Sequence, residues 1–243
     1  GRCTGAAAEF VATSIEKIRE AVVGHGQRLL PVIEEHKVVG VITRTDLLKL
    51  LQEELRTASG EGARKTRVLS GLMREKLPEW AFTLLKEAGE VAASHGFSAY
   101  AVGGFVRDLV LRRENLDIDI VIEGGNGIVF AEDFAKRKGA KVKVHHRFKT
   151  AVIVFPDGFK LDVATARLEY YERPGALPTV EQSSLKLDLY RRDFIMNTLA
   201  LSLDPERFGE LIDFFGAQKD LKEKTIRVLH NLSFIEDPTR MLR

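Results

Sequence analysis

The sequence predicts an α/β (α+β) fold, in which helices pack on a β-sheet. Short apolar or alternating segments, which are typical of strands, are interleaved with segments of helical periodicity at 105–113 and 127–138. The strand-like segments read SAYAVGG, LDIDIVIEG, AKVKVHH, TAVIVF and FKLDVATA. The chain has 243 residues, 44% of them hydrophobic by type, and can therefore bury one large core or two modest ones.

Composition narrows the classes of function. Lys and Arg number 37 against 35 Asp and Glu, so the net charge of +2 does not by itself indicate a polyanion-binding protein. Basic residues do gather at 135–149 and 190–194, although a solvated face explains the first run as well as a binding site does. The single cysteine, Cys3, excludes an intrachain disulfide framework and a multi-cysteine zinc site. The apolar runs are shorter than the ~20 residues that cross a bilayer, so we expect a cytoplasmic protein without a membrane span.

The first part of the chain predicts a domain of its own. Residues 1–55 read as helix, strand, polar turn, strand and helix, which is the order of a compact β/α unit. Residues 56–76 are expected to form a linker, because the segment RTASGEGARKTR is rich in glycine and charge and has no apolar period.

A second domain is expected to begin with a helix. Pro78 suits a first helical turn and Gly96 a helix end, and an apolar stripe that includes Trp80 and Leu84 is expected to cover the sheet. The strands described above follow this helix. After residue 170 the periodicity falls, and helical patterns resume from Leu185 to the C-terminus.

A pair of acids in LDIDIVIEG is a candidate metal site. On a strand, Asp117 and Asp119 share one face while the intervening isoleucines face the core. Their Cα atoms would lie ~6.6 Å apart, which allows both carboxylates to converge on metal ions ~3.5–4 Å apart. Oxygen-only ligation favours Mg²⁺, although a D-x-D pair also occurs on ordinary exposed strands and turns. A third acid, Asp162, lies on another apolar strand and indicates either the same metal site or a salt bridge.

The segment VGGFVRDLVLRR is a candidate phosphate site. Gly103 and Gly104 end a strand and allow close approach of the backbone to a ligand, and the following helix offers free N–H groups. Arg107, one turn into that helix, can add a charge-assisted contact. A glycine turn needed only for packing is the alternative. Together with the acids, this segment indicates a phosphoryl-transfer site that holds a triphosphate beside two metal ions.

Six blocks that follow one another along residues 77–243 resemble the head motifs of class II tRNA nucleotidyltransferases, the CCA-adding and A-adding enzymes. The blocks are AYAVGGFVRDLVL, LDIDIVIEG, HHRFKTAVIVF, KLDVATARLEYYERPGALPTVEQSSLKLDLYRRDFIMNTLAL, LIDFFGAQKDL and EDPTRMLR. The resemblance implies a nucleotidyltransferase palm with a mixed, mainly antiparallel sheet at 77–204 and the start of a helical neck at 205–243. It also implies template-independent addition of A or CCA to the tRNA 3′ end, from ATP and possibly CTP, with two Mg²⁺ ions.

The resemblance assigns roles to individual residues. Asp117 and Asp119 match two metal ligands, Asp162 matches a catalytic acid, and Gly103, Gly104 and Arg107 match a phosphate-binding turn. Residues that match the block lining the nucleotide are Arg191, Arg192, Asp193 and Asn197. Residues that match a block associated with interdomain movement are Asp213, Gly216 and Asp220. Residues that match the helix face reading the incoming base are Asp237, Arg240 and Arg243, for which an exposed i, i+3 salt bridge is the alternative.

The resemblance leaves the added nucleotide open. CC-adding relatives shorten the segment between the third acid and RRD, and this chain keeps 168–190, which favours A-adding or CCA-adding activity. Bacterial poly(A) polymerases share the superfamily and remain an alternative. Enzymes of this type continue beyond EDPTRMLR with tRNA-gripping helices, so we expect the chain alone to bind nucleotide weakly and to extend tRNA slowly or not at all.

Residues 1–55 resemble part of a CBS motif, in RLLPVIEEHKVVGVITRTDLLKLL. In that family a G-x-x-T-x-x-D run binds an adenosine nucleotide, which makes Thr43 and Asp46 candidate ligands here. Such motifs work in pairs, so a dimer through the CBS motifs is possible. An adenylate-sensing CBS module with an inactive head is the alternative of another class, and the fusion of a CBS module to this head favours A-addition.

Overall fold

A computed structural model of the chain describes residues 29–34, 37–43, 67–170 and 179–229. The chain divides into two compact units, 1–64 and 65–243. In the first unit, β1 (Leu29–Glu34) and β2 (Lys37–Thr43) pair antiparallel, as the two apolar runs around the turn predict. Of the candidate CBS ligands, Thr43 ends β2 and Asp46 lies outside the described residues.

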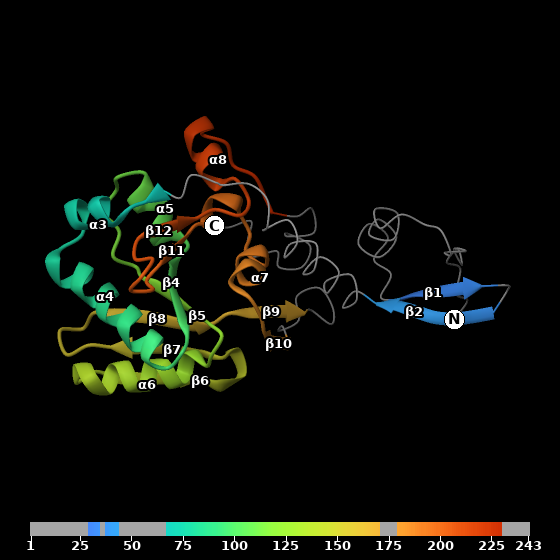
Figure 1. Cartoon of the computed structure of the whole chain (residues 1–243), viewed down its shortest axis with the longest axis horizontal. Coiled ribbons are helices and arrows are strands. Elements are labelled where there is room, and N and C mark those ends of the chain that lie inside the picture. The colour runs from blue at the N-terminus through green and yellow to red at the C-terminus, as the bar shows by residue number, and fades with distance from the viewer. Residues whose placement is uncertain (1–28, 35–36, 44–66, 171–178, 230–243) are drawn as a thin grey trace. The chain divides into compact units, whose positions relative to one another are not determined.

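The second unit is built on an eight-stranded sheet (Figure 1) with the strand order β3-β12-β11-β4-β5-β8-β7-β6. Among these described strands β5 and β8 form the one parallel pair, and every other neighbouring pair is antiparallel. The strands are β3 (Arg67–Val68), β4 (Ser98–Val102), β5 (Asp119–Glu123), β6 (Lys141–His145), β7 (Thr150–Val154), β8 (Lys160–Thr165), β11 (Ala200–Ser202) and β12 (Glu210–Ile212). The predicted α/β fold with a mixed, mainly antiparallel sheet is confirmed.

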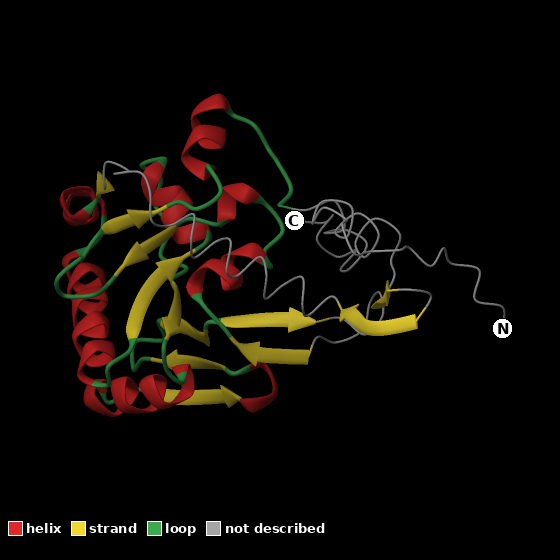
Figure 2. Ribbon diagram, turned by 45° about the vertical axis from the view of Figure 1, so that its right-hand side comes forward, coloured by secondary structure: helices red, strands yellow, loops and turns green. Residues whose placement is uncertain are grey.

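Helices cover this sheet unequally. The long helices α4 (Glu79–Ser94) and α6 (Gly127–Lys138) pack on one face, through a core that contains Phe82, Phe130 and Phe134 (Figures 1 and 2). The helix α6 begins where the Asn126 side chain accepts a hydrogen bond from the Ile128 amide. The shorter described helices are α3 (Ser70–Lys76), α5 (Gly104–Val110), α7 (Leu185–Tyr190) and α8 (Ala217–Glu223), with single 3₁₀ turns η2 (His146–Phe148) and η3 (Ile195–Asn197).

The opposite face of the sheet is covered only in part. The helix α7 packs there through Leu185 and Leu189, against Tyr100 and Val121 of the central strands. The carboxylate of Glu123 accepts a hydrogen bond from the Leu185 amide at 2.7 Å, which satisfies a free N–H at the start of this helix. A separate two-stranded sheet, β9 (Arg167–Tyr170) with β10 (Thr179–Gln182), directly follows β8 (Figure 2).

Two boundaries and one buried position differ from the sequence prediction. The expected linker 56–76 contains β3 and α3, because Leu69 and Met73 are buried in the core. The expected helical run from Leu185 contains β11 and β12, so residues 210–212 belong to the sheet and not to a helical neck. These three-residue strands are too short for periodicity to separate them from helix. Trp80 does not join the core stripe, since it stays 46% exposed and touches the edge of Phe159. No described helix is long and apolar enough to span a membrane.

Candidate active site

Two of the predicted acids lie side by side on the parallel strand pair. Asp119 begins β5 and is in register with Asp162 on β8. The isoleucines on either side of Asp119 are each 1% exposed, so the alternation predicted from LDIDIVIEG holds and the acids point away from the core. Asp117 precedes the strand and is exposed, while the carbonyl of Ile118 still accepts a hydrogen bond from the Asp162 amide.

These carboxylates destabilise one another as anions. Burial raises the pKa of Asp119 to about 6, Arg192 partly offsets this, and Asp162 and Asp117 raise it further. The pKa of Asp162 is also raised, first by burial and then by Asp117. Asp162 forms no ion pair with any described residue, so the salt-bridge reading of this acid lacks a partner in this part of the chain. The cluster therefore favours a bound cation.

The donor set of the cluster fits Mg²⁺ better than a soft metal. Within the described ranges, no group of three or more Asp, Glu, His or Cys side chains is arranged to hold a metal ion by itself. A Mg²⁺ ion does not need one, because it keeps several waters and binds through one or two carboxylates together with substrate phosphates. The neighbouring carboxylates of Asp119 and Asp162, with Asp117 beside them, supply oxygen donors of that kind.

The predicted glycine turn lies directly against this cluster. Gly103 has a φ of +79° and caps α5. A β-carbon at this position would lie 2.7 Å from Nη1 of Arg192 and 3.6 Å from Oδ2 of Asp119. Only glycine leaves room for the guanidinium at this point, because any β-carbon would lie too close to it. The neighbouring Gly104 is the first residue of α5.

Arg107 belongs to a hydrogen-bond chain next to the turn. Its Nη1 donates to Oδ1 of Asn197 at 2.7 Å, and its other nitrogens donate to both carboxylate oxygens of Asp108. These contacts lower the pKa of Asp108. Asn115 donates a hydrogen bond to Asp108 and accepts one from the Asp117 amide, so this series of hydrogen bonds ends at the acid cluster. Two residues predicted to bind nucleotide, Arg107 and Asn197, are thus joined across 90 positions.

A buried acid that the sequence analysis missed orients the two arginines of the RRD segment. Asp188 is 0% exposed, accepts hydrogen bonds from Arg191, and lies 3.6 Å from Nη2 of Arg192. The spacing of this acid three and four residues before the arginines, in LDLYRR, was the signal that could have found it. Nε of Arg192 is buried without a hydrogen-bond partner among the described residues. The next residue, Asp193, is 5% exposed and accepts a hydrogen bond from the Phe194 amide.

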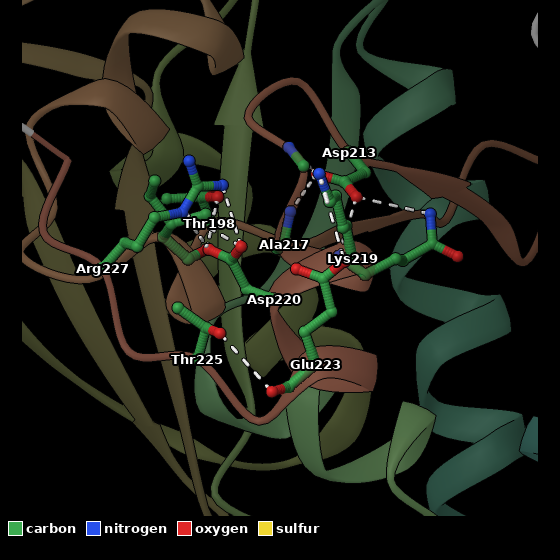
Figure 3. Close-up of polar contacts among 11 residues, drawn as sticks. Thr198, Asp213, Ala217, Lys219, Asp220, Glu223, Thr225 and Arg227 are labelled. Carbon is green, nitrogen blue, oxygen red and sulfur yellow. Dashed lines mark hydrogen bonds and ion pairs between the residues drawn. The ribbon is translucent and has the colours of Figure 1, made fainter.

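The acids of the LIDFFGAQKDL block, Asp213 and Asp220, hold α8 and its neighbouring segment in place (Figure 3). Their hydrogen-bond partners are not residues of the acid cluster. Asp213 accepts hydrogen bonds from three backbone amides at the start of α8, including that of Gly216. Asp220 is 3% exposed and accepts two hydrogen bonds from Nε of Arg227. The backbone carbonyl of Arg227 in turn accepts from the Ile195 amide. This network holds the segment after α8 against η3.

The residues expected to read the base, Asp237, Arg240 and Arg243, lie outside the described residues. The structure therefore brings together the acids, the glycine turn and Arg192 in one cluster. It places the hydrogen-bonded residues Arg107 and Asn197 beside that cluster. The hydrogen bonds of Asp213 and Asp220 form a separate network at α8.

Comparisons with known proteins assign families to two parts of this chain. Residues 99–227 match the family described as the poly A polymerase head domain, and residues 10–53 match the CBS domain. An A-adding tRNA nucleotidyltransferase of Geobacter sulfurreducens is 55% identical over 239 residues, which are 95% of this chain and 27% of that protein. The A-adding enzyme of Aquifex aeolicus is 46% identical and is matched over 92% of this chain and 26% of its own length. The chain thus spans about a quarter of these relatives.

Solved structures show the same fold. A Thermotoga maritima CCA-adding enzyme complexed with tRNA has a TM-score of 0.64 and 46% identity, and the match covers 73% of this chain and 39% of that one. A CCA-adding enzyme in complex with ATP gives the same TM-score, identity and coverage. With its head-domain match across more than half of its residues, its CBS match ahead of it and its cluster of acids beside a glycine turn, this chain belongs to the class II tRNA nucleotidyltransferase family, which carries the poly(A) polymerase head domain.

Proposed function

We propose that this chain carries the catalytic head of an A-adding tRNA nucleotidyltransferase, which transfers AMP from ATP to a tRNA ending in CC. One observation carries the proposal: Asp119 and Asp162 are in register on adjacent strands, and Arg192 and Gly103 lie directly against Asp119. Paired oxygen donors next to a guanidinium are what a metal-dependent reaction of a triphosphate requires.

Each part of the site has a separate task in this reaction. The 3′ hydroxyl oxygen of the RNA attacks the α-phosphorus, its proton passes to solvent, and the bond from that phosphorus to the pyrophosphate breaks. Arg192 and the turn at Gly103 bind the triphosphate, and Asp188 orients the guanidinium. Asp117, Asp119 and Asp162 would supply oxygen donors to Mg²⁺ together with the substrate phosphates, and the bound ion would lower the pKa of the attacking hydroxyl and neutralise charge on the leaving group.

The preference for A rests on the relatives. Two curated proteins that match over more than nine-tenths of this chain have the name A-adding tRNA nucleotidyltransferase. Their matches include the segment ahead of the head, where the CBS family match lies. The CCA-adding enzymes among the solved structures keep CCA-addition as the second candidate, since they match the head at 46% identity.

The experiment offers the protein three tRNAs, ending before CCA, after C and after CC, with either ATP or CTP and Mg²⁺. Incorporation of a single A onto the CC-ended tRNA supports A-addition. Incorporation of C onto the shorter tRNAs would show CCA-addition instead. Long A tails on RNA of any sequence would show poly(A) polymerase activity. ATP binding without incorporation, unchanged by Asp119→Ala, would place the nucleotide outside the head.

A further inference from the structure

A row of lysines lies on the same face of the sheet as the acid cluster. Along β6 the exposed residues Lys141, Lys143 and His145 alternate with Val142 and Val144, which pack toward the helix-covered core. The lysines therefore lie on the face that α4 and α6 leave free. No ion pair with a described residue neutralises either lysine.

The register of the sheet connects these lysines to the acids. Lys143 is opposite Val152, Val152 is opposite Asp162, and Asp162 is opposite Asp119. With strands about 4.8 Å apart, Lys143 lies about 10 Å from Asp162 and about 14 Å from Asp119, measured across the backbone.

A third lysine lies between the row and the acids. Lys141 is opposite Val154, which is opposite Lys160, the exposed residue that begins β8 two positions before Asp162. The three lysines flank half-buried Val152 and Val154 of β7, which form the floor between them. Positive charge thus extends from the sheet edge to the acids on one face.

The two sides of the acid cluster differ in what they offer a substrate. On the β4 side, Gly103 and Arg192 lie against Asp119 and are suited to the triphosphate. On the β8 side, Asp162 faces the open strand β7 and the lysines beyond it. Because one substrate is a triphosphate and the other a nucleic-acid end, the second side is left for the strand that carries the attacking hydroxyl.

We propose that the 3′-terminal strand of the RNA crosses this open face from β6 to Asp162, with Lys141, Lys143 and Lys160 bound to its phosphates. This inference rests on the proposed function. Exposed lysines that follow a backbone path are typical of single-strand binding, and their contribution falls with salt because bound phosphates release counterions. The match of charge and the continuity with the acids identify RNA as the occupant of the face.

The test uses a fluorescent minihelix RNA ending in CC and measures its dissociation constant by anisotropy at several salt concentrations. We expect Lys141→Ala/Lys143→Ala to weaken binding about tenfold at low salt and to reduce the slope of log Kd against log salt by about 1.4, the value for two phosphate contacts on a single strand. The KM for ATP should stay unchanged. Lys141→Arg/Lys143→Arg should restore binding.

The matched control removes the same charge from the other side of the sheet, in Lys86→Ala/Lys136→Ala on exposed positions of α4 and α6. This control should bind as the parent does. Equal weakening in both double variants, or no RNA binding by the parent, would overturn the inference. RNA binding that depends on Lys141 and Lys143, together with addition of C and not of A, would keep the inference and refute the proposed A-addition. Addition of A with unchanged RNA binding in the lysine variant would refute the inference and keep the proposed function.

Discussion

Nη1 of Arg192 lies 2.7 Å from the position that a β-carbon on Gly103 would occupy. These residues are 89 positions apart in the chain, and Oδ2 of Asp119 lies on the same side of the turn, 3.6 Å from that position. The glycine turn and the arginine are therefore one structural unit, and the acid cluster begins where they meet.

We expect Gly103→Ala to abolish most activity, with a fall of at least about 100-fold in kcat/KM for ATP. The methyl group displaces the guanidinium of Arg192, and the positive φ adds strain of about 1–3 kcal/mol. Gly124→Ala is the matched control, since Gly124 also has a positive φ but no atom within 4 Å of the added carbon. Comparable loss of activity in both variants would attribute the effect to backbone strain alone.

We expect Asp119→Asn to stabilise the protein in EDTA at pH 7. Its folded-state pKa of about 6 lies above the ordinary value of 3.8, so the folded state binds the proton more tightly than the unfolded state. Ionisation of Asp119 therefore removes about 2–3 kcal/mol from the stability of the wild type as the pH rises from about 4 through 6, and the asparagine variant does not have this loss. Denaturant unfolding at pH 4 and pH 7 measures the difference.

The same pair of proteins tests for the cation. Added Mg²⁺ should raise the melting temperature of the wild type and leave that of Asp119→Asn nearly unchanged. In the wild type the ion binds the ionised carboxylate and offsets its repulsion with the neighbouring acids, and the asparagine lacks this charge. An asparagine variant that is less stable than the wild type at pH 7 without metal would contradict the charge balance described for the cluster.

Asp188→Asn should lower both stability and affinity for ATP. The carboxylate is fully buried against Arg191 and Arg192, and removal of one partner from a buried ion pair costs roughly 3 kcal/mol. The KM for ATP should rise, because the guanidinium next to Gly103 loses its orientation. Asp133→Asn, which removes an acid from a solvent-facing pair with Arg137, should change neither quantity. A variant with normal KM would exclude the positioning role.

Asp213→Ala should destabilise the segment after the sheet. The carboxylate accepts from three backbone amides at the start of α8, and loss of such a cap costs about 1–2 kcal/mol. Asp213→Asn should keep part of the stabilisation by this cap, since one side-chain oxygen remains to accept a hydrogen bond. Thermal unfolding of the two variants checks the order, and an alanine variant as stable as the wild type would contradict it.

Local patterns explain why much of the head could be predicted. The alternation around Asp119 depends on one strand, and the start and end of α6 depend on residues next to it in sequence, so both were readable. Register between distant strands is not readable in this way. The sequence left Asp162 between two interpretations, and only the parallel pairing of β5 with β8 places it beside Asp119.

Other features that the sequence analysis did not predict have a similar cause. The strands β11 and β12 have three residues each and obtain their stability from sheet neighbours more than from their own sequence, so a helical reading of that region was wrong. Asp188 was missed because its function is to orient Arg191 and Arg192, and helical spacing identifies such an acid only once the arginines are recognised as ligands.

The most direct test of the site measures AMP added to a CC-ended tRNA together with the pyrophosphate released, for the wild type, Asp119→Asn and Asp162→Asn. We predict one pyrophosphate per AMP and a dependence on Mg²⁺ in the wild type, with rates at least about 100-fold lower in both variants. Nucleotide addition at the wild-type rate by either folded variant would contradict the assignment of the paired acids as the catalytic centre.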